Sequence, residues 1–216
     1  SVKSIVVHHA CVKPPLFMGF IFKIIDHFLT KTLTSLITVS KATQETIFKN
    51  SNLFKKDHSK SCIIHNGVPI NKFVRKNYLN SKLIENSENI LKIGMESRLS
   101  PDKGHDDLIR AFSKLPPEYK KKMIMIFVGE DERGQKNRLK ILAKNLNLEN
   151  KIKFLNYVDM DSKKIILSLD LLLSLTKSYE GFGLSIAEAM SVGTPILATD
   201  VGAVYEFFNN DCGKLI

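Results

Sequence analysis

The sequence predicts an α/β protein with parallel sheets, and two observations support this fold class. Short apolar runs alternate with amphipathic stretches along most of the chain, which is the pattern of strands alternating with helices. The chain has 216 residues, of which 44% are hydrophobic and 25% charged, so it can bury a real core and has an ordinary globular composition. Strict alternation of strand and helix predicts a parallel, doubly wound sheet.

The first part of the chain predicts a short series of elements and then a linker. Strands are expected at Ile5–His8, Leu36–Val39 and Cys62–His65, with helices at Leu16–Thr34 and Lys41–Lys49. Ser40 is placed to act as the N-cap of the second helix. The stretch KNYLNSKLIENSEN is polar enough to be a linker.

A second and longer series follows the linker. Strands are expected at Ile90–Met95, Met123–Val128, Ile152–Leu155, Leu171–Leu175 and Pro195–Ala198, with a further one at the closing GKLI. Helices are expected at His105–Lys114, Gln135–Asn145, Ser162–Leu169, Leu184–Ser191 and Ala203–Phe208, with a break at Pro116-Pro117. We therefore expect one domain to close within residues 1–73, a linker at 74–89 and a second domain at 90–216. Because the chain opens on Ser1 and stops at GKLI, we expect both domains to be incomplete.

The cysteines indicate the cellular location, and the charge indicates the kinds of partner that the protein can bind. Cys11, Cys62 and Cys212 are widely spaced and form no Cys-x-x-Cys pair, which favours a reducing, cytoplasmic location without a disulfide framework. Positions 1–80 hold 12 Lys or Arg against 3 Asp or Glu. This basic region is either a solvated face or a surface that contacts an anionic membrane. Nucleic-acid binding is not expected, because no recognition motif or aromatic platform accompanies the charge.

The stretch YEGFGLSIAEAM predicts a turn that can receive an anion. A strand ends near Leu175, and a helix begins close to Gly183. The N–H groups of Gly183, Leu184 and Ser185 at the start of that helix would attract phosphate. The alternative is a packing turn with a solvated glutamate, since glycine-containing strand-loop-helix units are common.

Two cations stand in another loop at a carboxyl end of the predicted sheet. Arg98 and Lys103 follow the strand at Ile90–Met95, where ligands of doubly wound sheets gather. Arginine offers a planar fork for phosphate oxygens and lysine a mobile point charge, so the pair is suited to a diphosphate. Alternatively, both are ordinary surface cations. The dinucleotide fingerprint is absent, because GFG is followed by LSI.

Taken together, these motifs resemble a known family. The pair Glu180 and Glu188 forms E-x7-E within EGFGLSIAEAMSVGTPILATDVGAVYEF, after RLSPDKGHDDLI and FVGEDERGQKNRLK. This is similar to the nucleotide-sugar half of a retaining glycosyltransferase of family 4, with the GT-B fold. VHH, ITVSKATQETIFK and IHNGVPINKF resemble the end of that family's first domain.

The resemblance implies a hexosyltransferase that uses a UDP- or GDP-sugar and an acceptor glycan or glycolipid, in cell-surface polysaccharide or glycolipid synthesis. Arg98 and Lys103 would bind the diphosphate without a metal or other cofactor, and Glu180 would lie beside the transferred sugar. The residues implied in donor binding are Gly183, Leu184, Ser185, Glu188, Asn156 and Val158. Retention implies attack from the face that the nucleotide leaves, with the diphosphate accepting the proton.

His8 is a further catalytic candidate by the same resemblance, although His9 competes for that match and either can be structural. Two departures leave local geometry open: LSLTKSYEGFG lacks the usual proline, and Asn156 replaces a common glycine. The missing front of the first domain implies that the segment alone is inactive.

Two rival interpretations concern metal binding and turnover. Asp159 and Asp161 resemble the metal-binding carboxylates of the other large transferase fold, yet they precede the helix expected at Ser162, where aspartate is a common cap. We therefore expect no metal site. The second rival is a module that binds nucleotide without turnover.

Overall fold

A computed structural model describes residues 5–8, 34–50, 58–69, 90–155 and 162–216. The chain divides into two compact units. Unit 1 comprises Ser1–Gly67, Tyr179–Gly183 and Val201–Phe207, and unit 2 comprises the remainder. The two short returns to unit 1 mean that residues from the last fifth of the sequence pack with residues from its first third.

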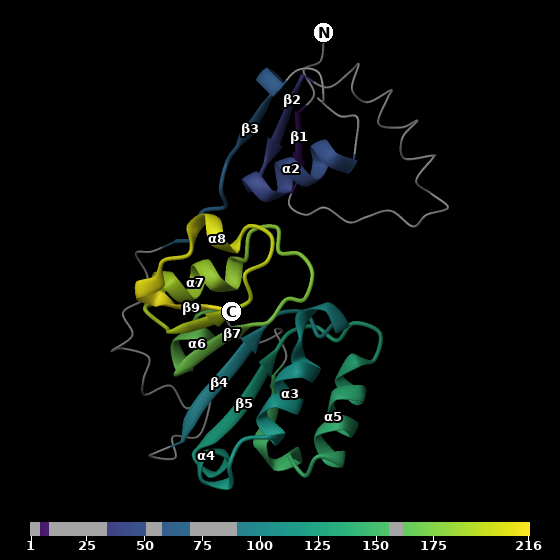
Figure 1. Ribbon diagram of the computed structural model, residues 1–216, viewed down its shortest axis with the longest axis vertical. Helices are drawn as coiled ribbons and strands as arrows, with labels where there is room; N and C mark the ends of the chain where they lie inside the picture. The colour runs from purple at the N-terminus through teal and green to yellow at the C-terminus, as the bar shows by residue number, and fades with distance from the viewer. Residues whose placement is uncertain (1–4, 9–33, 51–57, 70–89, 156–161) are drawn as a thin grey trace. The chain divides into compact units, whose positions relative to one another are not determined.

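Unit 1 contains a three-stranded parallel sheet in the order β1-β2-β3 (Figure 1). The strands are β1 (Ile5–His8), β2 (Ser35–Thr38) and β3 (Ser61–Ile63), and the helices are α2 (Lys41–Asn50) and α8 (Val204–Phe207). Leu36 of β2 and Ile47 of α2 are buried against each other, because an amphipathic helix must cover the apolar face of a small sheet.

Unit 2 contains a six-stranded parallel sheet in the order β6-β5-β4-β7-β8-β9. Its strands are β4 (Leu91–Glu96), β5 (Met123–Val128), β6 (Ile152–Leu155), β7 (Leu171–Ser174), β8 (Ile196–Ala198) and β9 (Gly213–Leu215). Within unit 2 the chain forms the central strand β4 first and then β5 and β6 toward one edge. It then returns to β7, beside β4, and continues through β8 to β9 at the other edge. The strand order therefore changes direction between β4 and β7, the point at which doubly wound sheets bind ligands.

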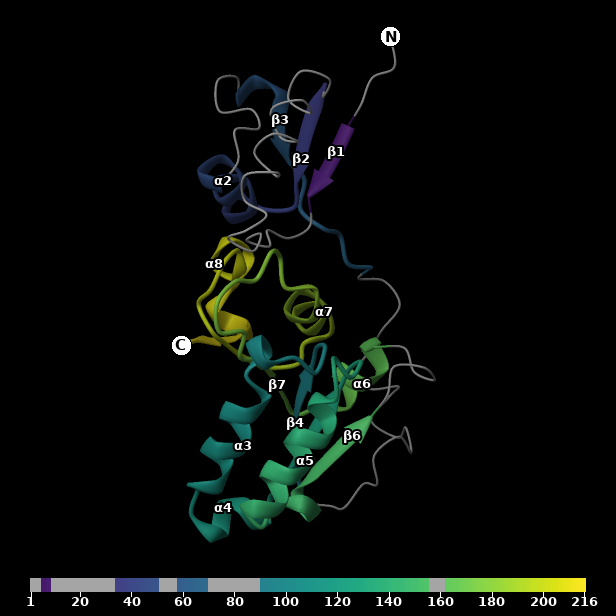
Figure 2. The same ribbon diagram turned by 90° about the vertical axis from the view of Figure 1, so that its right-hand side faces the viewer.

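Helices cover both faces of this sheet. They are α3 (His105–Ser113), α4 (Pro117–Lys121), α5 (Gln135–Asn145), α6 (Ser162–Ser168) and α7 (Leu184–Val192). In both views α3 and α5 lie together on one face, and α6 and α7 contact each other away from that pair (Figures 1 and 2). Phe127, fully buried in β5, contacts the rings of Phe154 and His105 edge-on at centroid distances of 5.5 and 5.0 Å.

The predicted α/β class and the alternation of strand and helix are confirmed. The bounds of β1, β5, α5 and β6 agree with the prediction, and the other predicted elements among the described residues have ends displaced by one or two residues. The break predicted at Pro116-Pro117 is wrong in part, because Pro117 begins α4. Proline suits the first position of a helix, where its missing N–H has no intrahelical acceptor.

The helix predicted at Leu16–Thr34 lies almost wholly outside the described residues. Within the described part of the chain, no helix has the length and apolar character needed to cross a membrane.

Candidate functional site

The loops that follow β4 and β7 meet at one edge of the unit 2 sheet. These strands are parallel neighbours, with Ile93 opposite Leu171, so both loops leave the carboxyl edge. The contact between them is direct: the Lys177 N–H donates to the Asp102 carbonyl at 2.8 Å. The predicted cation Lys103 donates from Nζ to Thr176 Oγ1 at 3.3 Å.

Gly104 allows this close approach. Its φ is +79°, in the left-handed region, and a Cβ at this position would clash with the Leu175 carbonyl of the other loop. Glycine satisfies both requirements because it lacks a Cβ. The residue thus brings the β4 loop against the β7 loop and places Lys103 at their junction.

Arg98, the second predicted cation, lies in the same β4 loop. Its Nη1 is 3.0 Å from Glu132 Oε2, and the two side chains are 60% and 38% exposed. Because a guanidinium carries five N–H donors in a planar fork, it can keep this ion pair and still bind an anion through other donors. The exposure leaves the charge accessible to a ligand.

A cluster of acidic and basic side chains lies beside these cations and was not predicted. Lys177 Nζ is 3.1 Å from Asp106 Oδ1 and 2.9 Å from Asp107 Oδ2. Burial acts to raise the pKa of Asp106, but the hydrogen bond and charge of Lys177, with the charge of Arg138, outweigh it, so the pKa is below its usual value. The hydrogen bond to Asp107 raises the pKa of Lys177 despite an opposing effect of burial. This cluster fixes the start of α3 to the β7 loop.

His105, the first residue of α3, is a buried neutral group that follows the β4 loop. Its side chain is buried, with Nε2 3.5 Å from Ser97 Oγ. Burial lowers the pKa of His105 from 6.5 to about 4, with the charge of Lys103 adding to the effect and those of Asp106 and Asp102 opposing it. At neutral pH this imidazole therefore adds no positive charge to the edge.

The predicted phosphate-binding turn leads into α7. Gly183 has a φ of +87°, and Leu184 begins the helix, so the first N–H groups of α7 have no acceptor within the helix. Leu184 is exposed, while Ser185 and Glu188 are partly buried. Since Leu184 and Glu188 are four positions apart, they share one face of α7.

Glu180 lies in unit 1, in the loop 179–183. The Glu180 carbonyl accepts a hydrogen bond from the Ala203 N–H at 2.9 Å. Gly202 has a φ of +62°, and a Cβ there would clash with the backbone of Glu180. The two segments of unit 1 are therefore in direct main-chain contact at the predicted catalytic glutamate.

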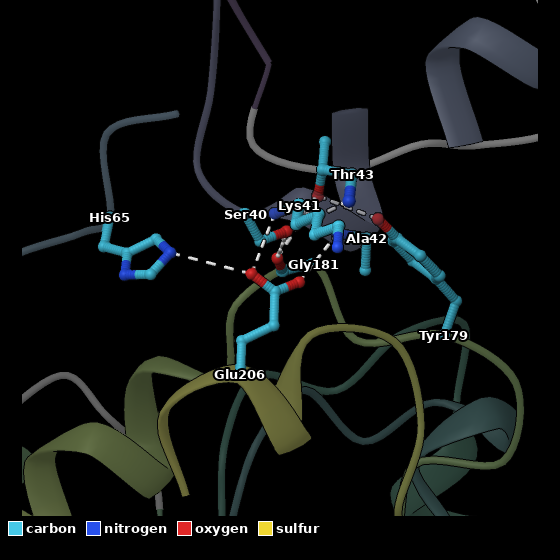
Figure 3. Close-up of polar contacts among 8 residues, drawn as sticks. All are labelled: Ser40, Lys41, Ala42, Thr43, His65, Tyr179, Gly181 and Glu206. Carbon is cyan, nitrogen blue, oxygen red and sulfur yellow. Dashed lines mark hydrogen bonds and ion pairs between the residues drawn. The ribbon is translucent and has the colours of Figure 1, made fainter. Parts of the chain in front are cut away.

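The same loop contacts the start of α2, as Figure 3 shows. The Gly181 carbonyl accepts from Ser40 Oγ at 2.7 Å and from Thr43 Oγ1 at 3.2 Å. The Thr43 N–H donates to Ser40 Oγ at 3.0 Å, which confirms the predicted N-cap. Tyr179 OH is 2.8 Å from Thr43 Oγ1.

Glu206 of α8 forms a second contact with α2 that was not predicted (Figure 3). Its carboxylate accepts from the Lys41 N–H at 2.8 Å and from the Ala42 N–H at 2.7 Å. His65 Nε2 is 3.6 Å from the same carboxylate, and the Glu206 side chain is only 8% exposed. No local pattern indicates a cap supplied from more than 160 positions away.

The remaining predicted residues lie at the end of β1 or outside the described residues. His8 is the last residue of β1. Asn156, Val158, Asp159 and Asp161 lie outside the described residues. At the carboxyl edge of the unit 2 sheet, the chain therefore presents the two predicted cations, exposed or partly exposed, while α7 supplies helix N–H groups. Both kinds of group favour a phosphate-bearing ligand.

The chain is similar in sequence to proteins that transfer sugars. It is 28% identical over 195 residues to a glycosyltransferase of Methanocaldococcus jannaschii, covering 86% of this chain and 47% of that protein. It is 26% identical over 196 residues to the O-antigen chain mannosyltransferase RfbU of Salmonella typhimurium, covering 89% of this chain and 50% of that one. The chain thus spans about half the length of these relatives.

Solved structures show the same fold. The crystal structure of Anabaena HepE in complex with UDP and glucose matches with a TM-score of 0.84 and 26% identity, covering 99% of this chain and 57% of that one. WaaG, a glycosyltransferase involved in lipopolysaccharide biosynthesis, matches with a TM-score of 0.77 at 18% identity, over 98% of this chain and 60% of that one. The predicted GT-B type of α/β fold is confirmed by these neighbours.

The family whose sequence pattern matches is described as "Glycosyl transferases group 1", and the match runs from residue 75 to residue 216. It includes both loops at the carboxyl edge of the unit 2 sheet and all of α7. The chain belongs to the glycosyl transferases group 1 family.

Proposed function

We propose that the chain is part of a retaining glycosyltransferase of family 4 that transfers a hexose-type sugar from a nucleoside-diphosphate sugar to an acceptor hydroxyl. The observation that carries this proposal is the contact of the β4 and β7 loops, in which Lys103 Nζ lies 3.3 Å from Thr176 Oγ1. Arg98 lies in the same β4 loop. The Anabaena relative was solved with UDP-glucose, which supports a nucleotide-sugar donor.

The roles of the residues follow from their chemistry. Arg98 and Lys103 bind the donor diphosphate and stabilise the charge that develops on it as the sugar leaves. The N–H groups of Gly183, Leu184 and Ser185 bind phosphate oxygens at the start of α7. Glu188, on the Leu184 face of that helix, accepts hydrogen bonds from the ribose.

Glu180 lies beside the transferred sugar in this proposal, and His8 is a second catalytic candidate. Asn156 and Val158 line the nucleobase. The acceptor hydroxyl attacks the face from which the diphosphate departs, and the diphosphate takes its proton, so the anomeric configuration is retained. Since the cations neutralise the diphosphate, no metal is required, and transfer by the complete enzyme is expected to proceed in the presence of EDTA.

The acceptor is proposed to be a glycan or glycolipid of the cell surface, reached from the cytoplasmic side. The RfbU relative is named as an O-antigen chain mannosyltransferase, which supports this class. The excess of 12 basic over 3 acidic residues in positions 1–80 suits contact with anionic lipid. Sedimentation of the complete protein with anionic vesicles, and not with neutral ones, is the expected result.

Calorimetric titration with UDP and GDP tests the donor site. One of the two nucleotides should bind, and Arg98→Ala and Lys103→Ala should each weaken it by about tenfold, the effect of losing a charge-assisted hydrogen bond. Lys121→Ala is the matched control, because Lys121 is exposed just before β5, at the opposite edge of the sheet. Absence of binding, or equal losses in all three variants, would contradict the proposal. Binding without any sugar transfer by the complete protein would instead favour a nucleotide-binding module.

A further inference from the structure

The backbone around Glu180 is held by residues far away in the sequence. The Glu180 carbonyl accepts from the Ala203 N–H at 2.9 Å. The next carbonyl, that of Gly181, accepts from Ser40 and Thr43, which lie 141 and 138 positions away. Two consecutive peptide carbonyls are thus fixed from two other segments of unit 1. The shape of this loop is therefore not set by its own sequence alone.

The two hydroxyls that hold Gly181 form a connected and buried network. Ser40 and Thr43 are 1% and 0% exposed. In one arrangement of protons, Ser40 donates to the Gly181 carbonyl at 2.7 Å and accepts the Thr43 N–H at 3.0 Å. Tyr179 OH then donates to Thr43 Oγ1 at 2.8 Å. Such bonds are strong because the surroundings exclude water.

Glu206 fixes the helix turn that presents these hydroxyls. Its two oxygens accept from the first two N–H groups of α2, at 2.8 and 2.7 Å, immediately after Ser40. A carboxylate is stabilised at a helix N-terminus both by these charge-assisted bonds and by the helix dipole. Glu206 is also only three positions from Ala203, which binds the Glu180 carbonyl. The same short segment, 203–206, therefore contacts both the loop and the helix that holds the loop.

We propose that Ser40, Thr43 and Glu206 are positioning residues for Glu180. They fix the main chain that carries this carboxylate and thereby set where it stands beside the transferred sugar. The inference rests on the proposed function for the role of Glu180, whereas the anchoring itself does not. Because the groups proposed to bind the diphosphate are Arg98, Lys103 and the α7 N–H groups, loss of the anchor should affect the sugar more than the nucleotide.

Amide hydrogen exchange tests the anchor without any ligand. In Glu206→Gln and in Thr43→Val, the protection of the Ala203 amide should fall by about tenfold, as expected for losing one buried or charge-assisted hydrogen bond. Thr43→Ser keeps the hydroxyl and should stay near the wild type. Glu45→Gln makes the same chemical change on the exposed face of α2 and should change nothing.

The Phe127 amide in the unit 2 core serves as the reference for global unfolding, and its protection should be the same in all variants. If Thr43→Val does not fold, Glu206→Gln and Thr43→Ser still decide the question. Unchanged Ala203 protection in Glu206→Gln overturns the proposal. So does a fall of equal size in Glu45→Gln.

Paired titrations then connect the anchor to the sugar. The probes are UDP-glucose against UDP and GDP-mannose against GDP. For the pair that binds, the gain in affinity from the sugar should shrink by about tenfold in Glu206→Gln and in Thr43→Val, while affinity for the nucleotide alone changes less than about twofold. An unchanged ratio overturns the positioning role. If no probe binds the wild type, the proposed function fails, and the exchange measurement still decides the anchor.

Discussion

Replacing His105 should remove a specific part of the pH dependence of stability. Its side chain is 1% exposed, and among the described residues its Nδ1 is a buried nitrogen with no hydrogen-bond partner. A proton added to this ring would carry a charge into a site formed by Phe127 and the α3 core, where water cannot solvate it. The folded protein therefore holds His105 neutral to lower pH than the unfolded chain does.

The size of the effect follows from the two pKa values. Burial lowers the pKa of His105 from 6.5 to about 4, and each unit corresponds to about 1.4 kcal/mol. Between these values the unfolded chain binds more protons than the folded one, so stability falls as the pH falls. The loss begins near pH 6.5, reaches about 3 kcal/mol near pH 4, and levels off below that as the folded state is protonated too.

Urea unfolding at a series of pH values between 7 and 3.5 checks this, followed by circular dichroism because the chain contains no tryptophan. The comparison is between the wild type and His105→Gln, so that contributions of the carboxylates, including Asp106, largely cancel. The difference in unfolding free energy should change by about 3 kcal/mol across the window. His105→Leu should lose the same pH dependence, which separates titration from the contact with Ser97. A difference that stays constant from pH 6.5 to pH 4 would refute the reasoning.

Three further changes have definite expected outcomes. Gly202→Ala should destabilise the protein by at least about 2 kcal/mol more than Gly193→Ala in chemical unfolding, because both have positive φ but only Gly202 has no room for a Cβ; equal losses would contradict the close approach to Glu180. Phe127→Ala should cost about 3–5 kcal/mol in the same assay, since the ring is fully buried, and a loss below about 1 kcal/mol would contradict its place in the core. In the complete enzyme, Arg98→Ala should cost on the order of 3 kcal/mol of transition-state stabilisation in kcat/KM, whereas near-normal turnover would exclude its leaving-group role.

The bounds of helices and strands were predicted best where local pattern and tertiary packing agree. The continuous apolar run of β5, Met123–Val128, is typical of a strand buried on both faces, and the structure has the same bounds. Helix α5 begins after Gly134, and its predicted bounds are also confirmed. Element ends shifted where the sequence is less distinct, as at β7, which ends at Ser174 before a polar loop.

The site was predicted only in part because long-range contacts leave little local signal. The position of Arg98 and Lys103 in the loop after β4 was predicted from the sequence, and so was the capping position of Ser40 before α2. The capping carboxylate Glu206 resembles any exposed glutamate in the sequence, since its partners lie 164 and 165 positions away. The same holds for Lys177, whose partners lie at the start of α3. Side chains that join distant segments become visible only when the fold brings those segments together.

In the donor site that we propose, one pyrophosphate is bound by the cations of the β4 loop and the first N–H groups of α7. A crystal structure of the protein with bound UDP or GDP tests it most directly. Phosphate oxygens are expected within about 3 Å of Lys103 Nζ and of the Leu184 and Ser185 N–H groups, with the Arg98 guanidinium on the same phosphates. A nucleotide whose phosphates contact neither the cations nor the start of α7 would contradict this binding mode.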